Sequence, residues 1–138
     1  MTRRLLVGVG LAGLLAAGCG PAATDTSKFS GEQKQVAKVV ADLQSDGQGR
    51  KPDDICSKLL SADLQRTVSA AGSSCGAEMK KAVEDADTFK LQVRTVDVTS
   101  PTEATATVHG TNQGQGVTRT FEFVKEGGAW KIKDFGSG

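Results

Sequence analysis

The residues with the widest chemical scope in this chain are three cysteines, Cys19, Cys56 and Cys75, and its one histidine, His109. A cysteine can carry a lipid, form a disulfide, bind a metal ion or act as a nucleophile. A zinc site needs several nitrogen or sulfur ligands, and a nucleophilic thiol needs a basic partner, usually histidine. Because His109 is far from every cysteine in the sequence, the metal and nucleophile uses have little support.

The segment before Cys19 has the layout of a secretory signal peptide. Arg3 and Arg4 precede an uncharged apolar run over residues 5–17, and the small residue Gly18 follows it. As a helix the run would span ~20 Å, which is shorter than the ~30 Å hydrocarbon core of a bilayer. Basic, apolar and small-residue regions in this order are typical of a signal peptide. Two interpretations of this segment involve no lipid on Cys19: a plain signal peptide in which the cysteine is incidental, or a buried N-terminal helix.

The sequence Leu15-Ala16-Ala17-Gly18-Cys19 resembles the bacterial lipobox. The resemblance implies that residues 1–18 are removed and that Cys19 becomes a lipidated N-terminus. The protein would then be held by membrane lipid, through acylated Cys19, on the extracytoplasmic face of the bacterial cell membrane. Two acyl chains are sufficient for stable anchoring, whereas one is marginal.

With Cys19 assigned to lipid, Cys56 and Cys75 remain as an even pair in an exported chain, where disulfides persist. A bond between them would close a loop of about 20 residues, which the chain-entropy model values at ~3 kcal/mol. A metal site and a catalytic thiol are the alternatives for this pair.

Residues 20–30 are small, polar and aperiodic, which predicts a flexible tether. We therefore expect lipidated Cys19 with its tether over residues 19–30, and a single domain over residues 31–138. Without Arg3 and Arg4 the mature chain is close to neutral, which disfavours nucleic acid as a partner. The sequence contains no phosphate-binding glycine motif, serine elbow or metal-ligand spacing, so we expect no cofactor and no metal.

Hydrophobic spacing predicts helices before residue 87. Ser30 and Gln33 match a capping box at the start of a helix whose apolar stripe covers residues 36–43 and which stops near Gly47. The expected starts of three further helices are Pro52, Ser61 and Ser74.

Beyond Asp87 the apolar period changes from about 3.6 to 2, which predicts strands. The parity of the apolar positions also switches, so we expect a bulge near Arg94 and Thr95. The expected strands are 89–99, 103–109, 117–125 and 129–135, with a long hairpin loop over 110–116. Helices followed by a four-stranded antiparallel meander predict an α+β fold, with N-terminal helices packed on the sheet.

The order of these elements resembles the cone-shaped nuclear-transport-factor-two-like superfamily, which includes SnoaL-like proteins and cystatin-like sheets. The residues that carry the resemblance are the helix over 36–43, the segment from Cys56 to Cys75, and the terminal sequence GAWKIKDF over residues 128–135. The resemblance implies a curved sheet that wraps a helix and leaves a cone-shaped pocket. It also implies a homodimer formed through the sheet.

Catalytic members of that superfamily commonly use a carboxylate base with a tyrosine or an acid as oxyanion donor, and this chain has no tyrosine. Asp97 and Glu122 are the strand carboxylates available, but solvated positions are the simpler interpretation. Strand alternation puts His109 on the polar side. Arg94 and Arg119 could bind an anion in a cone, although a bulge position for Arg94 and an exposed cross-strand position for Arg119 are the simpler interpretations.

The aromatic side chains Phe121, Phe123 and Trp130 are candidates for lining an apolar pocket, and the same residues could form the core. Our leading hypothesis is a membrane-anchored extracytoplasmic lipoprotein with a non-catalytic domain that binds a small apolar ligand or a protein. The alternative is an isomerase- or cyclase-like enzyme acting on a small apolar molecule in the cone. A third hypothesis is an interaction module that presents the loop over 110–116.

Overall fold

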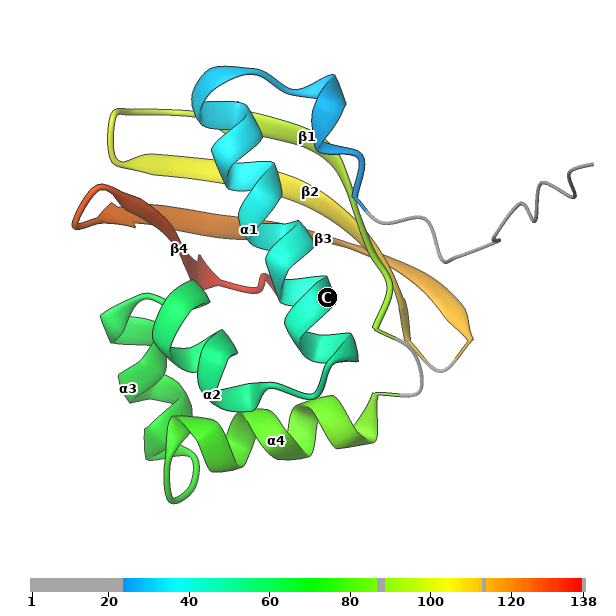
Figure 1. Ribbon diagram of the computed structural model, residues 1–138, viewed down its shortest axis with the longest axis vertical. Coiled ribbons are helices and arrows are strands. Elements are labelled where there is room, and N and C mark those ends of the chain that lie inside the picture. The colour runs from blue at the N-terminus through cyan, green and yellow to red at the C-terminus, as the bar shows by residue number, and fades with distance from the viewer. Residues whose placement is uncertain (1–23, 87–88, 113, 138) are drawn as a thin grey trace, which may run out of the picture.

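The computed structural model describes residues 24–86, 89–112 and 114–137 (Figure 1). The expected signal peptide and Cys19 therefore lie outside the described residues. Helices come first and an antiparallel sheet follows, which confirms the α+β class. Among the helices of the described residues, none combines the length and the apolar character needed to cross a membrane.

The helical elements are η1 (Thr26–Lys28), α1 (Gly31–Gln48), α2 (Pro52–Asp54), the π-helical turn η2 (Ile55–Leu59), α3 (Ala62–Ala70) and α4 (Cys75–Asp85). The strands are β1 (Leu91–Val98), β2 (Glu103–Asn112), β3 (Gln115–Glu126) and β4 (Ala129–Asp134).

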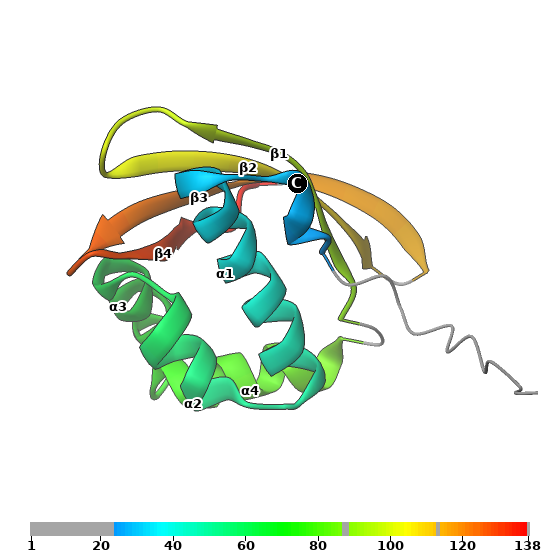
Figure 2. The same ribbon diagram turned by 45° about the horizontal axis from the view of Figure 1, so that its top comes forward.

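The four strands form one sheet in which each strand pairs with its neighbours in the sequence, in the order β1-β2-β3-β4. The sheet curves over helices α1 to α4, which lie on one side of it, with α4 farthest from the strands (Figure 2). The register of β1 with β2 shifts between Val93 and Thr95, so the predicted bulge is confirmed.

The inner face of the sheet forms half of the core. Along β2, Ala104, Ala106 and Val108 are buried while Thr105 and Thr107 between them are not. Burying one face is the period-2 pattern expected of a half-covered sheet. The largest fully buried side chains are Phe123, Ile55, Leu60, Ile132, Val36, Val40 and Val108.

Helix α1 supplies the opposing apolar stripe. Val36, Val40 and Leu43 are at most 3% exposed and follow the spacing of one helix face. The helix does not stop at Gly47, as the sequence suggested, but continues to Gln48. Gly47 instead allows close packing, since a Cβ there would lie 2.5 Å from Cδ1 of Phe89.

Polar side chains of α1 bind the free edge of β1. The Gln33 amide Nε2 donates to the Val96 carbonyl at 3.0 Å, and the Gln48 amide Nε2 donates to the Phe89 carbonyl at 2.9 Å. The capping-box prediction is therefore wrong, because Gln33 reaches the sheet and the Ser30 side chain makes no capping hydrogen bond. Covering an edge strand in this way removes a template for unwanted strand pairing.

The predicted disulfide is present between Cys56 in η2 and Cys75 at the start of α4, with a Cα–Cα distance of 6.1 Å. It joins two short segments that both contribute to the core, η2 through Ile55 and Leu59 and α4 through Met79 and Val83. Neither cysteine retains a thiol, so the described residues offer no thiol nucleophile or thiolate ligand.

The hairpin between β2 and β3 is tighter than predicted. The expected loop over 110–116 is mostly strand, because Gly110 pairs with Val117 and Thr111 pairs with Gly116. In the described residues of this hairpin the pairing continues to Asn112 and Gln115, so strand replaces most of the expected loop.

Candidate functional site

The inner face of the sheet, α1 and α4 line a half-open cavity of about 380 Å³. This volume falls in the range of small-molecule sites, about 300–1,000 Å³. Leu43, Met79, Ala82 and Ala86 line it from the helices; Leu91, Val108, Val117 and Phe121 line it from the sheet; Phe89 and Phe135 complete the apolar wall. We call this space the concave cavity.

The polar groups of the concave cavity are few. Lys90, Thr111 and Arg119 are the lining residues with polar side chains, among those described. The described lining contains no carboxylate, imidazole or thiol. General acid–base chemistry needs a proton-transfer group within hydrogen-bond reach of the substrate, and the amine of exposed Lys90 is the one group of that kind in the described lining. The arrangement can therefore hold an apolar molecule and orient a polar end, and it offers no carboxylate–imidazole or thiol–imidazole pair for catalysis.

Two aromatic rings form the floor of the cavity. The rings of Phe121 and Phe135 meet edge to face, with centroids 5.3 Å apart and planes at 85°. The chain after Phe135 passes close to β3, where a Cβ on Gly136 would lie 2.4 Å from the Thr120 carbonyl oxygen. Gly136 also has φ of +71°, a conformation that favours glycine. Gly136 thus allows Phe135 to pack against Phe121.

Leu91 at the cavity wall is fixed by two polar contacts. Its N–H donates to Oε1 of Gln44 at 2.6 Å, and its carbonyl accepts from Oγ1 of Thr24 at 3.0 Å. Gln44 and Thr24 are 4% and 6% exposed. Sequence reasoning missed both, because Gln44 looks like a polar neighbour of the apolar Leu43 and Thr24 falls in the expected tether.

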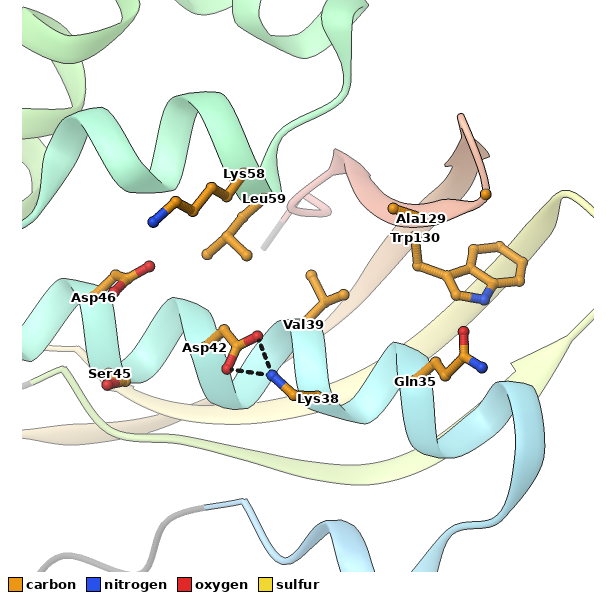
Figure 3. A pocket seen from close by; sticks show the side chains of 11 residues that line it. Gln35, Lys38, Val39, Asp42, Ser45, Asp46, Lys58, Leu59, Ala129 and Trp130 are labelled. Carbon is orange, nitrogen blue, oxygen red and sulfur yellow. Dashed lines mark hydrogen bonds and ion pairs between the residues drawn. The ribbon is translucent and has the colours of Figure 1, made fainter.

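A second space, of about 510 Å³, lies between α1, η2 and the β3–β4 turn (Figure 3). Its lining is more charged, and Lys38 pairs with Asp42 across one helical turn at 2.7 Å. Exposed pairs of this kind contribute little to stability or binding. Trp130 lies at one end of this groove (Figure 3). The charges of the groove are partly satisfied by each other, which makes it the weaker candidate.

The three aromatic candidates from the sequence are thus distributed over different environments. Phe121 lines the concave cavity, Trp130 lines the charged groove, and Phe123 is 1% exposed in the core. Phe123 lines neither space. The alternation of residues along β3 and β4 places all three side chains on the inner face of the sheet. They nevertheless contact different surroundings, because the sheet is curved.

Trp130 has a polar partner that the sequence did not indicate. Its indole Nε1 donates to Oε2 of Glu32 at 2.5 Å, and Nζ of Lys125 lies 3.1 Å from both Glu32 oxygens. The hydrogen bond from Trp130, with that from Lys125, lowers the pKa of the Glu32 carboxyl below its ordinary value. The contact fastens the first turn of α1 to the β3–β4 hairpin.

The remaining candidate residues lie on or near the outer face of the sheet. His109 pairs with Thr118 in register, and its Nδ1 lies 3.0 Å from Oγ1 of Thr118. Asp97 and Glu122 are exposed and both pair with Thr105 across β2. Arg94 is exposed at the bulge. The polar-side interpretation of His109, and the solvated interpretation of the two acids, agree with these positions.

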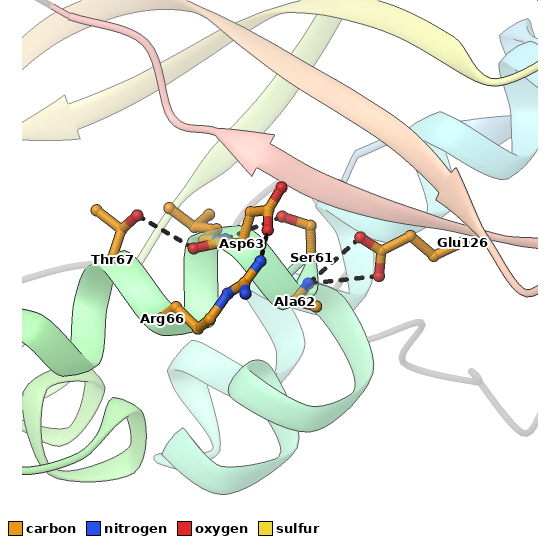
Figure 4. A network of polar contacts seen from close by, with 7 residues as sticks. Ser61, Ala62, Asp63, Arg66, Thr67 and Glu126 are labelled. Carbon is orange, nitrogen blue, oxygen red and sulfur yellow. Dashed lines mark hydrogen bonds and ion pairs between the residues drawn. The ribbon is translucent and has the colours of Figure 1, made fainter.

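A further polar network surrounds the start of α3 (Figure 4). The Ser61 hydroxyl accepts from the Leu64 N–H at 3.1 Å, as an N-cap, and the Ala62 N–H donates to both Glu126 carboxylate oxygens at 3.3 Å. The Ser61 N–H donates to the Ile132 carbonyl at 2.8 Å. Each contact gives a hydrogen-bond partner to a backbone group at a helix terminus or at a strand edge. We therefore assign the network a structural role.

A protein-family model described as low molecular weight antigen MTB12, C-terminal domain, matches residues 62–134, just over half of the chain. The matched segment begins with α3 and ends with β4, so it contains α3, α4 and the whole sheet. No curated protein matches the chain. Among the described residues, no group of histidine, cysteine, aspartate and glutamate side chains could hold a metal ion.

Proposed function

The chain belongs to the bacterial family of the low molecular weight antigen MTB12, C-terminal domain, and we propose that it is an exported, membrane-anchored, non-enzymatic protein that binds a small apolar ligand. The observation that carries the proposal is the concave cavity, whose wall is apolar and whose described lining contains no carboxylate, imidazole or thiol. Apolar walls with a few polar groups are typical of ligand sites.

The resemblance to the nuclear-transport-factor-two-like superfamily supports the same site. In that fold the ligand pocket lies between a curved sheet and the helices it wraps, which is where the concave cavity lies. A fold alone does not transfer an activity. The proposal therefore rests on the lining of the cavity, and the resemblance only agrees with its location.

The anchor part of the proposal rests on the lipobox-like sequence that ends at Cys19, and on where the domain begins. Thr24, the first described residue, bonds to Leu91 in the cavity wall. Residues 20–23 separate Thr24 from Cys19, and a fully extended chain covers about 3.5 Å per residue. Lipidated Cys19 would therefore hold Thr24, and with it the Leu91 side of the concave cavity, within roughly 20 Å of the membrane surface.

The anchor is tested by fractionating bacteria that express the full chain. The wild type is expected in the detergent phase, and Cys19→Ala is expected in the aqueous phase or retained with its leader. Ala22→Ser, a tether substitution that leaves the lipobox intact, is the control. Equal detergent partitioning of Cys19→Ala and the wild type would reject the lipid anchor.

Ligand binding is tested by calorimetry with decanol, an uncharged apolar probe, on the chain from residue 19 with Cys19→Ser. This chain retains every core residue, since the core lies between Val36 and Ile132. Ala82→Phe places a ring in the cavity from an exposed helix position, and Ala70→Phe is the control on exposed α3. We expect binding in the parent and in Ala70→Phe, and none in Ala82→Phe. Absence of binding in the parent would leave protein recognition as the better account.

A further inference from the structure

The polar groups of the concave cavity lie toward one end of it. Leu91, Gly110 and Val117 form one row across three strands, and Lys90 and Thr111 adjoin this row. Arg119 pairs with Val108, in the row between Val117 and Phe121. The next inward-facing residue of β3 after Arg119 is Phe121, so the cavity lining changes from cationic to aromatic along β3.

Arg119 occupies an unusual position for a charged residue. It lies on the inner face of β3, in the same alternation as Val117 and the buried Phe121, yet it is itself exposed. Its side chain therefore stands where the cavity meets water. Within the part of the chain that the structure describes, Arg119 and Lys90 form no ion pair with a carboxylate. The two cations at this end are available to a charge on a ligand.

An anionic group suits these cations for two physical reasons. A guanidinium donates paired hydrogen bonds to a carboxylate, and such charge-assisted bonds are about twice as strong as neutral ones. Charge attraction is also stronger beside an apolar wall than in bulk water. The described lining brings no acid that would repel the anion.

The size of the cavity limits the rest of the ligand. A volume of about 380 Å³ is near the lower end of the range for small-molecule sites, about 300–1,000 Å³. That space suits one short chain better than two. We infer that the concave cavity binds a single-chain fatty acid, with the carboxylate at Arg119 and Lys90 and the alkyl chain against Phe121 and Phe135. This inference rests on the proposed function and specifies its ligand.

The test compares decanoate with decanol, which differ in the head group and share the alkyl chain, on the same chain from residue 19. We expect decanoate to bind about tenfold more tightly or better, the scale of one hydrogen bond to a charged group. Arg119→Gln keeps the polarity of the side chain, and it should weaken decanoate binding far more than decanol binding, so that the preference falls to within about twofold. Arg94→Gln, at the bulge and outside the cavity lining, is the matched control and should keep the full preference.

A series of octanoate, decanoate and dodecanoate tests the alkyl end. Each buried methylene should increase the affinity by about fourfold until the cavity is filled, and the increase should then stop. Equal binding of decanoate and decanol in the parent, with both lost in Ala82→Phe, would overturn the fatty-acid inference and leave the proposed function intact. A preference for decanoate that survives Arg119→Gln would also overturn it. If neither probe binds, the inference and the proposed ligand function both fail.

Discussion

The indole nitrogen of Trp130 lies 2.5 Å from a carboxylate oxygen of Glu32, and this contact joins β4 to the first turn of α1. Lys125 reaches the same carboxylate from β3. The contact closes the end of the molecule opposite the concave cavity, so α1 is held to the sheet by apolar packing along its length and by polar contacts near both ends.

Glu32→Gln should lower the stability of the domain at neutral pH. The folded state lowers the pKa of Glu32 through the hydrogen bonds from Trp130 and Lys125, so the carboxylate stabilises the fold above its ordinary pKa of about 4.3. That contribution is lost as the pH falls through the lower folded-state value. The stability difference between the wild type and Glu32→Gln should therefore shrink on acidification from neutral pH, as urea unfolding would show.

Glu84→Gln is the control for this pH effect. Glu84 is exposed on α4 and its oxygen is 3.9 Å from Nζ of Lys80, at the limit of an ion pair. Its substitution should change stability little at any pH. A pH-independent difference between the wild type and Glu32→Gln would mean that the charge of Glu32 contributes nothing.

Replacing the disulfide should cost about 3 kcal/mol of unfolding free energy, the chain-entropy value for a loop of this size. The paired substitution is Cys56→Ala with Cys75→Ala, which avoids leaving one thiol free. Chemical unfolding of both proteins measures the difference. In the wild type, alkylation of Cys56 or Cys75 without prior reduction would show that the bond is not formed.

Gln44→Leu should destabilise the domain by about 1–3 kcal/mol, because it leaves the Leu91 N–H without its acceptor in a buried setting. The same change at Gln48, which is exposed and bonds the Phe89 carbonyl, should cost less. Urea unfolding gives the cost, and hydrogen exchange at the Leu91 amide should quicken only in Gln44→Leu. Equal costs at both sites would contradict the assigned role of Gln44.

Gly136→Ala should reduce both stability and decanol affinity. The added Cβ would meet the Thr120 carbonyl oxygen at 2.4 Å, at a backbone φ that costs a non-glycine residue about 1–2 kcal/mol. Gly114→Ala has a similar φ of +78° but open space around the Cβ, so it should show the conformational cost alone. If Gly136→Ala binds decanol as tightly as the wild type, the position of the Phe135 ring does not affect ligand binding.

The elements that follow from local periodicity were predictable. The stripe Val36, Val40 and Leu43 and the alternation along β2 each depend on residues a few positions apart, so the sequence records them directly. The parity switch in β1 gave the bulge for the same reason. The disulfide was predictable because two cysteines remain once Cys19 is assigned to lipid, and because disulfides persist in exported proteins.

The contacts missed in the sequence join residues that are far apart in the chain. Gln33 was predicted to close a capping box, and Gln44 and Glu32 resemble solvated helix positions. No residue near them in the sequence indicates that β1 and β4 approach this helix. The hairpin loop was overestimated for a related reason. Glycine-rich sequence favours turns locally, but pairing of Gly110 with Val117 continues the ladder.

The position of Arg119 shows the same limit at the candidate site. Charge and exposure suggested a solvated cross-strand residue, and its side chain is exposed. Only the three-dimensional structure shows that this exposed position lines an apolar cavity. Sequence alternation gives the face of a strand, whereas a cavity depends on how far that face is covered.

The central claim is that the concave cavity, and not the charged groove, is the binding site. Chemical-shift mapping by nuclear magnetic resonance during a decanol titration tests it most directly. We expect shifts at Leu91, Val117 and Phe121 that are absent in Ala82→Phe, with Lys38 and the Trp130 indole unmoved. Shifts centred on Lys38 and Trp130, or shifts that persist unchanged in Ala82→Phe, would contradict the claim.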